Sequence, residues 1–201
     1  MENTIDPAVL LLNGATREGG NTDSLLSYIE TGAYKIGVPV EQIYLRDCSF
    51  GQCIGCYYCN DYGECSQNDD MTLIRFKIQK ASVLVFAAPI YWSDLPGLMK
   101  TFIDRLYFYY HSPSSHLIAN KKVVIIHVMA EKEDIAFETE LVNKFYQRMC
   151  RSLRLDMVDT LIFDKLYSAS DLRKRPDFIG QCYQYGQKLG ELIEYEQVNR
   201  L

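Results

Sequence analysis

Short runs of consecutive apolar residues alternate along this chain with longer segments of helical periodicity. Strands are predicted at five of these runs: Val9–Asn13, Val40–Leu45, Val83–Ala88, Val123–Met129 and Met157–Phe163. Helices are predicted between and after them: Thr22–Gly37, Asp70–Lys80, Pro96–Tyr109, Asp134–Leu153 and Pro176–Glu194. In the first helix, apolar residues at i, i+1, i+4 and i+8 from Leu25 share one face, as expected for an amphipathic helix.

Apolar strands that alternate with helices indicate a parallel sheet covered on both faces. Five strands favour the flavodoxin-like, doubly wound order 2-1-3-4-5 over a six-stranded dinucleotide-binding fold. The chain has no internal repeat and no linker of biased composition, so we expect one α/β domain over residues 1–201, with a Cys- and Tyr-rich excursion at 48–68. Ligands of such folds bind at the carboxyl ends of the strands, which directs attention to the loops after the first, third and fourth strands.

Composition narrows the classes of partner. The 201 residues are 48% hydrophobic and 23% charged, as is usual for a folded protein. A net charge of −5 argues against broad electrostatic binding to nucleic acid or to an anionic membrane. No apolar run reaches the roughly 18 residues of a membrane span, and residues 1–6 lack the features of a secretory signal. We therefore expect a cytoplasmic protein.

The loop between the first strand and the first helix has the composition of a phosphate cradle. Three glycines, Gly14, Gly19 and Gly20, permit tight turns that aim backbone N–H groups inward, and the helix that follows adds partial positive charge. The loop also supplies polar side chains as donors: Thr16, Arg17, Asn21 and Thr22. It is neither a Walker loop nor a dinucleotide fingerprint, and the alternative is an ordinary glycine-rich turn with Asn and Thr capping.

An apolar, aromatic loop follows the third strand. Its sequence, Pro89-Ile90-Tyr91-Trp92, places large rings where the strands meet solvent. Such rings are costly to expose, so the loop suits stacking of a planar ligand or contact with a partner subunit. Plain core packing is the alternative.

Three motifs in order resemble the flavodoxin-like NAD(P)H-dependent FMN reductase family. They are Gly-x-x-Arg-x-Gly-Gly-Asn-Thr after the first strand, Pro-Ile-Tyr-Trp after the third, and Lys100-x-x-x-Asp104-Arg105 in the next helix. The resemblance extends from Val9 to about Arg105 and is loose beyond. It implies FMN as the cofactor, with its phosphate at Thr16, Arg17, Asn21 and Thr22 and its ring near Pro89, Ile90, Tyr91 and Trp92.

Two positions depart from the pattern of that family. Ala15 stands where a serine is usual, and Thr16 is the candidate replacement for the missing hydroxyl. The loop after the fourth strand, usually rich in glycine, reads from His127 to Glu131 and must take another shape. His127 is either near the flavin ring or, as we favour, a hydrogen-bonded strand residue.

Four of the seven cysteines form a compact group in the excursion: Cys53, Cys56, Cys59 and Cys65. The Cys-x2-Cys-x2-Cys spacing is typical of iron–sulfur ligands and resembles that of iron–sulfur flavoproteins, a branch of the same family. It indicates a [4Fe–4S] cluster, with a reduced structural loop packed by tyrosines as an equal alternative. The other three, Cys48, Cys150 and Cys182, are expected to be ordinary buried thiols.

The leading functional hypothesis is an oxidoreductase, an FMN reductase or quinone-type enzyme, that passes electrons from NAD(P)H through FMN to a small-molecule or protein acceptor. No separate nucleotide fingerprint is present, so NAD(P)H would dock on the flavin and leave before the acceptor enters. No catalytic side chain is assigned, because the flavin carries the chemistry. The alternatives are an iron–sulfur flavoprotein that acts as an electron carrier without NAD(P)H turnover, and a redox-sensing or scaffold protein.

Exposed aromatic residues also predict self-association. Tyr91, Trp92 and the run Tyr107–Tyr110 would be awkward to leave in water, so we expect a homodimer or tetramer. The segment 107–118, which adds two histidines, is interpreted as a lid over the flavin, a dimer contact or a partly buried loop.

Overall fold

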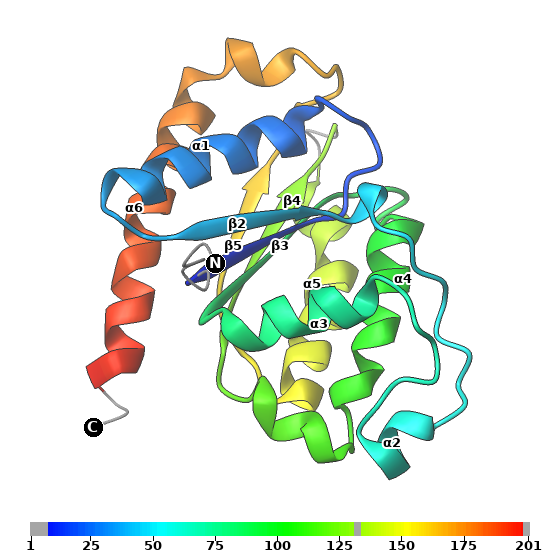
Figure 1. Cartoon of the computed structure of the whole chain (residues 1–201). Coiled ribbons are helices and arrows are strands. Elements are labelled where there is room, and N and C mark those ends of the chain that lie inside the picture. The colour runs from blue at the N-terminus through cyan, green and yellow to red at the C-terminus, as the bar shows by residue number, and fades with distance from the viewer. Residues whose placement is uncertain (1–7, 131–133, 199–201) are drawn as a thin grey trace.

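Five parallel strands form one sheet in the order β2-β1-β3-β4-β5 (Figure 1), which confirms the predicted flavodoxin-like topology. The structure is a computed structural model and describes residues 8–130 and 134–198. The strands have these bounds: β1 (Val9–Asn13), β2 (Val40–Tyr44), β3 (Val83–Pro89), β4 (Lys122–Val128) and β5 (Asp156–Phe163).

The helices lie close to their predicted positions, with one clear exception. Their bounds are α1 (Asn21–Lys35), α2 (Tyr58–Tyr62), α3 (Met71–Lys80), α4 (Gly97–Arg105), α5 (Ile135–Leu153) and α6 (Pro176–Val198). The helix expected at Pro96–Tyr109 ends at Arg105 and continues as a 3-10 turn, Leu106–Tyr109. Such tightening is common at helix C-termini and is not visible in the hydrophobic pattern.

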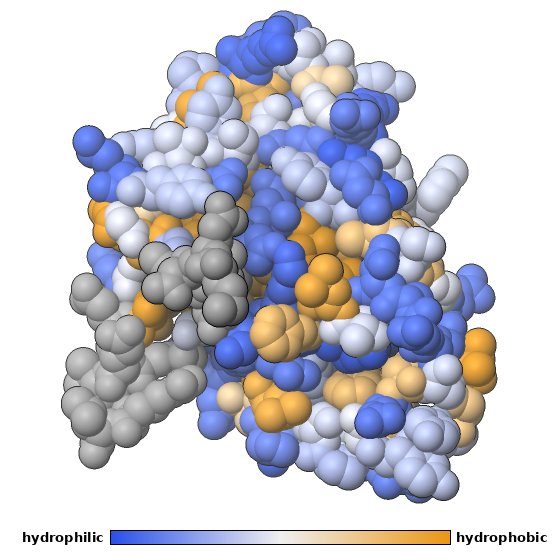
Figure 2. Space-filling view, in the orientation of Figure 1, coloured by the Kyte–Doolittle hydropathy of each residue, from blue (hydrophilic) through white to orange (hydrophobic). Residues whose placement is uncertain are grey.

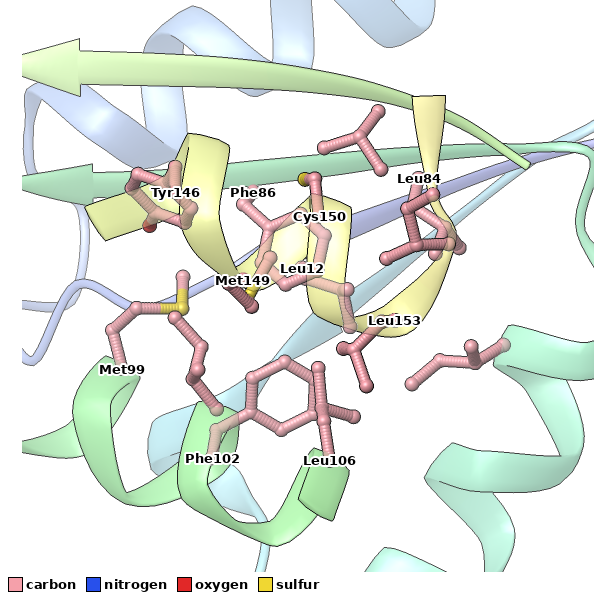
Figure 3. Close-up of a cluster of buried hydrophobic side chains, with 14 of the residues drawn as sticks. Leu12, Leu84, Phe86, Met99, Phe102, Leu106, Tyr146, Met149, Cys150 and Leu153 are labelled. Carbon is pink, nitrogen blue, oxygen red and sulfur yellow. The ribbon is translucent and has the colours of Figure 1, made fainter. Parts of the chain in front are cut away.

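The helices cover both faces of the sheet (Figure 1), with α1 and α6 on one face and α3, α4 and α5 on the other. On the second face, side chains of α4 and α5 meet over the apolar side chains of β1 and β3 (Figure 3). Met99 and Phe102 of α4 and Tyr146 of α5 are all buried there. This packing fixes α4 against the sheet, and α4 in turn separates the two sites described below.

On the first face, α1 and α6 are in backbone contact. A Cβ atom on Gly32 would lie 2.0 Å from the carbonyl oxygen of Tyr183, and one on Gly186 would lie 2.0 Å from that of Ile29. Only glycine permits so close an approach. The contact holds α6 against the helix that begins at the first-strand loop.

The surface drawn in Figure 2 is polar over most of its area, with apolar side chains over the middle, where α3 lies. Leu73 and Phe76 are the exposed apolar residues of α3, at 58% and 53%. In the described part of the chain, no helix is both long and apolar enough to cross a membrane.

Candidate cofactor cavity and cysteine loop

A cavity of about 370 Å³ lies at the carboxyl edge of the sheet, between the loops that follow β1, β3, β4 and β5. Its volume falls within the roughly 300–1,000 Å³ of small-molecule sites. It is lined by Ala15, Arg17, Gly20, Asn21, Thr22, Pro89, Ile90, Tyr91, Val128, Met129, Ala130, Leu166 and Tyr167.

Most of the residues predicted to hold a cofactor meet at this cavity. Six of the eight line it: Arg17, Asn21, Thr22, Pro89, Ile90 and Tyr91. The other two, Thr16 and Trp92, are exposed and lie outside the lining. Ala15 itself is part of the wall, so the structure does not place the Thr16 hydroxyl where the missing serine would be.

The polar end of the cavity is the N-terminus of α1. Gly20 occupies the N-cap position, and no side chain of the described residues caps the helix. The first N–H groups of a helix have no acceptor within it, and they carry partial positive charge. The Thr22 hydroxyl is almost buried and makes no hydrogen bond to any other described residue. Together with Arg17, which lines the same cavity, these groups have the chemistry that suits an anion such as a phosphate.

The side chain of Asn21 has a different role from the one predicted. Its amide Nδ2 donates to the carbonyl oxygens of Leu166 at 3.2 Å and Ser168 at 2.9 Å, and its Oδ1 accepts from the Leu172 N–H at 3.3 Å. The carboxamide therefore ties the loop after β5 to the start of α1. It builds the cavity wall that carries Tyr167 instead of offering free donors to a ligand.

A network behind the first-strand loop holds that loop in shape. Asp23 accepts hydrogen bonds from the Gly19 N–H at 2.8 Å and from Asn13 Nδ2 at 2.7 Å, and it forms a two-bond ion pair with Arg46 at 3.0 and 2.9 Å. Arg46 also donates to the Ala15 carbonyl at 3.3 Å. Burial alone would lower the pKa of Arg46, but hydrogen bonds and the charge of Asp23 outweigh burial and raise it. This network thus holds the loop after β1 in shape.

The apolar wall comes from the loop after β3. Its N–H group at Ile90 donates to the Val128 carbonyl at 2.9 Å, which joins the loops of β3 and β4. A tight turn follows, in which Tyr91 and Asp94 exchange backbone hydrogen bonds at 3.0 and 3.1 Å. Trp92 and Ser93 inside this turn have positive φ angles of 53° and 57°, an uncommon conformation for bulky residues. The turn leaves the Trp92 side chain fully exposed and outside the cavity lining.

His127 belongs to the hydrophobic core, as the favoured interpretation holds. Its side chain is 1% exposed, and Nε2 lies 2.9 Å from Oδ1 of Asn143. Burial lowers the pKa of this imidazole, and the hydrogen bond to Asn143 opposes that effect. The residue does not line the cavity. Glu131, the last residue of the unusual loop after β4, lies outside the described residues.

The excursion at residues 48–68, here called the cysteine loop, extends along α4 and includes α2 (Figure 1). Its four clustered cysteines line one small cavity of about 30 Å³ next to Arg105, the last residue of α4. The first cavity adjoins the loop that precedes α4. The nine residues of α4 correspond to about 14 Å of helix, so the two sites lie at opposite ends of it.

The four thiols are close to one another but do not enclose a single ion. All four cysteines line the same small cavity, and burial raises the pKa of Cys59. Cys56 also lies 3.1 Å from the Ser66 hydroxyl. Among the described residues, no three Cys, His, Asp or Glu side chains are arranged to hold one metal ion.

The remaining cysteines largely match expectation. All seven are free thiols; Cys150 and Cys182 are buried, and burial raises the pKa of each to about 12, whereas Cys48 is only partly buried.

The segment 107–118 is not a lid over the first cavity. It follows the far end of α4, and Tyr107 and Phe108 line the cysteine cavity instead. Phe108 and Tyr109 are buried, at 8% and 1% exposure, because the 3-10 turn directs them into the core. Of the aromatic residues predicted to be exposed, Tyr91 and Trp92 are largely exposed, at 47% and 101%, whereas Phe108 and Tyr109 are not.

A doubly wound sheet of this order, with a cavity between the loops after β1 and β3 at its carboxyl edge, defines a flavodoxin-like protein. The sequence profile of the NADPH-dependent FMN reductase family matches residues 7–152. The chain belongs to this family.

Known proteins similar to this chain include two iron–sulfur flavoproteins from Archaeoglobus fulgidus. One is 28% identical over 61% of this chain and 56% of its own length, and the other is 36% identical over 48% and 47%. The chain spans about half the length of the curated relatives it matches. Among solved structures, an NAD(P)H:quinone oxidoreductase from Methanothermobacter marburgensis has the same fold, with a TM-score of 0.73, 18% identity and coverage of 90% of this chain and 94% of its own.

Proposed function

We propose that this protein is an FMN-dependent oxidoreductase that takes electrons from NAD(P)H and passes them to a second acceptor. The observation that carries the proposal is the meeting of two different surfaces in one cavity. The uncapped start of α1 with Thr22 and Arg17 suits a phosphate, and the Pro89–Tyr91 wall suits a planar ring. FMN has both features in one molecule.

The residues present fit this cofactor. The first N–H groups of α1, the Thr22 hydroxyl and the Arg17 guanidinium would hold the phosphate, while Pro89, Ile90 and Tyr91 would lie along the ring. When bound, FMN supplies hydride acceptance and electron transfer. The protein binds and orients the cofactor and excludes water from one side of it, and no side-chain acid or base is assigned.

The mouth of the cavity is where we place exchange of the two substrates. Tyr91 and Tyr167 line the cavity from different loops and are 47% and 82% exposed, so the site is open to solvent between them. We infer that NAD(P)H and the electron acceptor, a small molecule or a protein, use this opening in turn. A ping-pong scheme follows from that arrangement.

Rapid mixing under anaerobic conditions tests the proposal. Protein loaded with FMN is mixed with NADH or NADPH, and bleaching of the flavin absorbance is followed; reoxidation by a quinone is then measured separately. Parallel lines in initial-rate plots at varied acceptor would support alternating use of one site. If neither nicotinamide reduces the bound flavin, the oxidoreductase proposal fails and the electron-carrier alternative remains.

A second function is favoured by the cysteine cavity: an iron–sulfur flavoprotein that acts as an electron carrier. Support comes from the four thiols that line one cavity and from the names of the Archaeoglobus relatives. Thiolates so arranged would bind a [4Fe–4S] cluster, which supplies one-electron transfer. The present cavity of about 30 Å³ has room for only about two water molecules, so the exposed stretch 51–57 would have to move outward to admit a cluster.

Iron analysis after anaerobic purification and reconstitution tests this second function. A cluster with four cysteine ligands gives about four irons and four sulfides per chain. Cys56→Ser should lose them and keep FMN affinity, while Cys48→Ser, whose thiol lies outside the cysteine cavity, is the matched control. Wild-type protein that takes up no iron would leave a structural cysteine loop.

A further inference from the structure

Arg105 is a fully buried cation at the junction of α4 and the cysteine loop. Its side chain is 1% exposed, although it ends an amphipathic helix whose other ion pair, Lys100 with Asp104, is on the surface. A buried charge is destabilising unless it is paired and its donors are satisfied. The contacts of Arg105 therefore show how its charge is paired and how its N–H donors are satisfied.

Two groups of the cysteine loop, and Asp69 directly after it, accept hydrogen bonds from this guanidinium. Two N–H groups donate to the Asp69 carboxylate at 2.6 and 3.0 Å, Nη1 also donates to the Gly51 carbonyl at 2.9 Å, and Nη2 lies 3.5 Å from Sγ of Cys65. Gly51 stands before the first of the four cysteines, and Asp69 stands after the last. Arg105 thus joins both ends of the loop and one of its thiols.

The charge of Arg105 is already matched by Asp69, so its contact with Cys65 is not needed for neutrality. Burial alone would raise the pKa of Asp69, but hydrogen bonds from Arg105 and its charge outweigh burial and hold it below the usual value. The contact with Cys65 therefore serves placement of the thiol.

Two further hydrogen bonds join the two ends of the cysteine loop, and both are exposed to solvent. The Ser49 N–H donates to Asp70 at 2.6 Å, and Gln67 donates to the Gln52 carbonyl at 3.1 Å. Residues 51–58 of the cysteine loop are all exposed. Among the described residues, Arg105 alone donates from outside the loop to one of the four thiols.

We propose that Arg105 is the positioning residue of the cysteine site: it fixes both ends of the loop and keeps the Cys65 thiol at the wall of the small cavity. A planar guanidinium can do this because its donors point in several fixed directions, which an ammonium group cannot reproduce. The group that this site binds rests on the iron–sulfur function proposed above. The placement of Cys65 does not depend on it, because that placement is a property of the metal-free protein.

The test compares Arg105→Lys with Arg46→Lys in metal-free protein. Both arginines form a two-bond pair with an aspartate, but Arg46 supports the phosphate loop instead. The readout is the rate at which iodoacetamide alkylates each cysteine, measured by peptide mass spectrometry. In the wild type, Cys53 and Cys56 should react fast and the half-buried Cys65 slowly.

Arg105→Lys should speed alkylation of Cys65 by about tenfold, the equilibrium effect of losing one charge-assisted hydrogen bond. Lysine keeps the positive charge near the thiol, so a faster rate reports exposure of Cys65. FMN affinity should stay within about twofold, because the two sites lie at opposite ends of α4. Arg46→Lys should show the reverse pattern, with weaker FMN binding and unchanged Cys65.

An unchanged Cys65 rate in a normally folded Arg105→Lys variant would overturn the assignment. A loss of FMN affinity as large as that of Arg46→Lys would instead mean that Arg105→Lys is misfolded, and Asp69→Asn, at a partly exposed position, then gives the answer. A faster Cys65 rate with normal FMN binding in Asp69→Asn supports the assignment, and an unchanged rate overturns it.

Iron uptake separates this inference from the cluster proposal. If the wild type takes up no iron but Arg105→Lys still exposes Cys65, the cluster proposal fails and the positioning role stands. If both proteins take up iron equally and hold it equally long under a chelator, the cluster proposal stands and the positioning role fails.

Discussion

Replacing Asn21 and Thr22 separately distinguishes two functions of neighbouring residues in the first turn of α1. Asn21→Ala removes three hydrogen bonds to the loop after β5. It leaves the Leu166 carbonyl and the Leu172 N–H without these partners, whereas the Ser168 carbonyl still accepts from the Asp171 N–H. At about 0.5–1.5 kcal/mol each, with two of the bonds long, we expect a loss of about 2–3 kcal/mol in the free energy of unfolding. FMN binding should weaken as well, because the wall that carries Tyr167 is no longer held.

Thr22→Ala should do nearly the opposite. The Thr22 hydroxyl has no partner among the described residues, so its removal should change the free energy of unfolding by less than about 1 kcal/mol. A hydrogen bond to a charged phosphate contributes about 1.5–3 kcal/mol, which corresponds to a rise of about 10- to 100-fold in the Kd for FMN.

Urea denaturation of the cofactor-free proteins gives the first quantity, and titration with FMN followed by flavin fluorescence gives the second. Thr31→Ala is the matched control, because Thr31 lies on the same helix, is exposed and bonds only within it. The reasoning is refuted if Asn21→Ala is as stable as the wild type. It is equally refuted if Thr22→Ala binds FMN with unchanged affinity.

Three further predictions concern other parts of the molecule. Burial lowers the pKa of His127 in the folded state, so near and below the unfolded value of about 6.5 the unfolded chain binds more protons than the folded one. The free energy of unfolding should therefore decrease as the pH is lowered through this range. His127→Gln should flatten that part of the pH profile in denaturation experiments. Trp92 is the only tryptophan and is fully exposed, so its emission should be that of a solvated indole and should be quenched when FMN binds nearby; emission insensitive to saturating FMN would contradict the site. Exposed Tyr91 and Trp92, with Phe137 and Leu141 at the start of α5, lead us to expect a homodimer or tetramer by light scattering, and a monomer mass at micromolar concentration would reject it.

The strands and their order could be predicted from the sequence because each strand is a short apolar run between amphipathic helices. Once the order was known, the edge of the sheet where ligands bind followed from topology. The hydrogen bonds and ion pairs that hold the loops around the cavity could not be predicted in this way. Asp23 and Arg46 are 23 residues apart, and Asn21 reaches a carbonyl 145 residues away. No local pattern marks such pairs, because they are formed only when the sheet brings separate loops together.

The cysteine spacing predicted a cluster or a structural loop, and which of the two is right stays a prediction. The four cysteines line one cavity, but their spacing gave no information on where the loop lies. The loop runs to the far end of α4, and its position depends on the buried contacts of Arg105, which the sequence showed only as part of a family motif. The Trp92 turn was equally hidden, because two positive φ angles at residues other than glycine have no sequence signal.

The central claim, that the start of α1 binds the phosphate of FMN, is tested most directly by comparing FMN with riboflavin, which lacks the phosphate. At least two charge-assisted contacts of about 1.5–3 kcal/mol each predict that the wild type binds FMN at least about 100-fold more tightly than riboflavin. Thr22→Ala should reduce that ratio by about tenfold or more while leaving riboflavin affinity unchanged. Equal affinities for the two flavins, or a ratio that Thr22→Ala does not alter, would contradict the account.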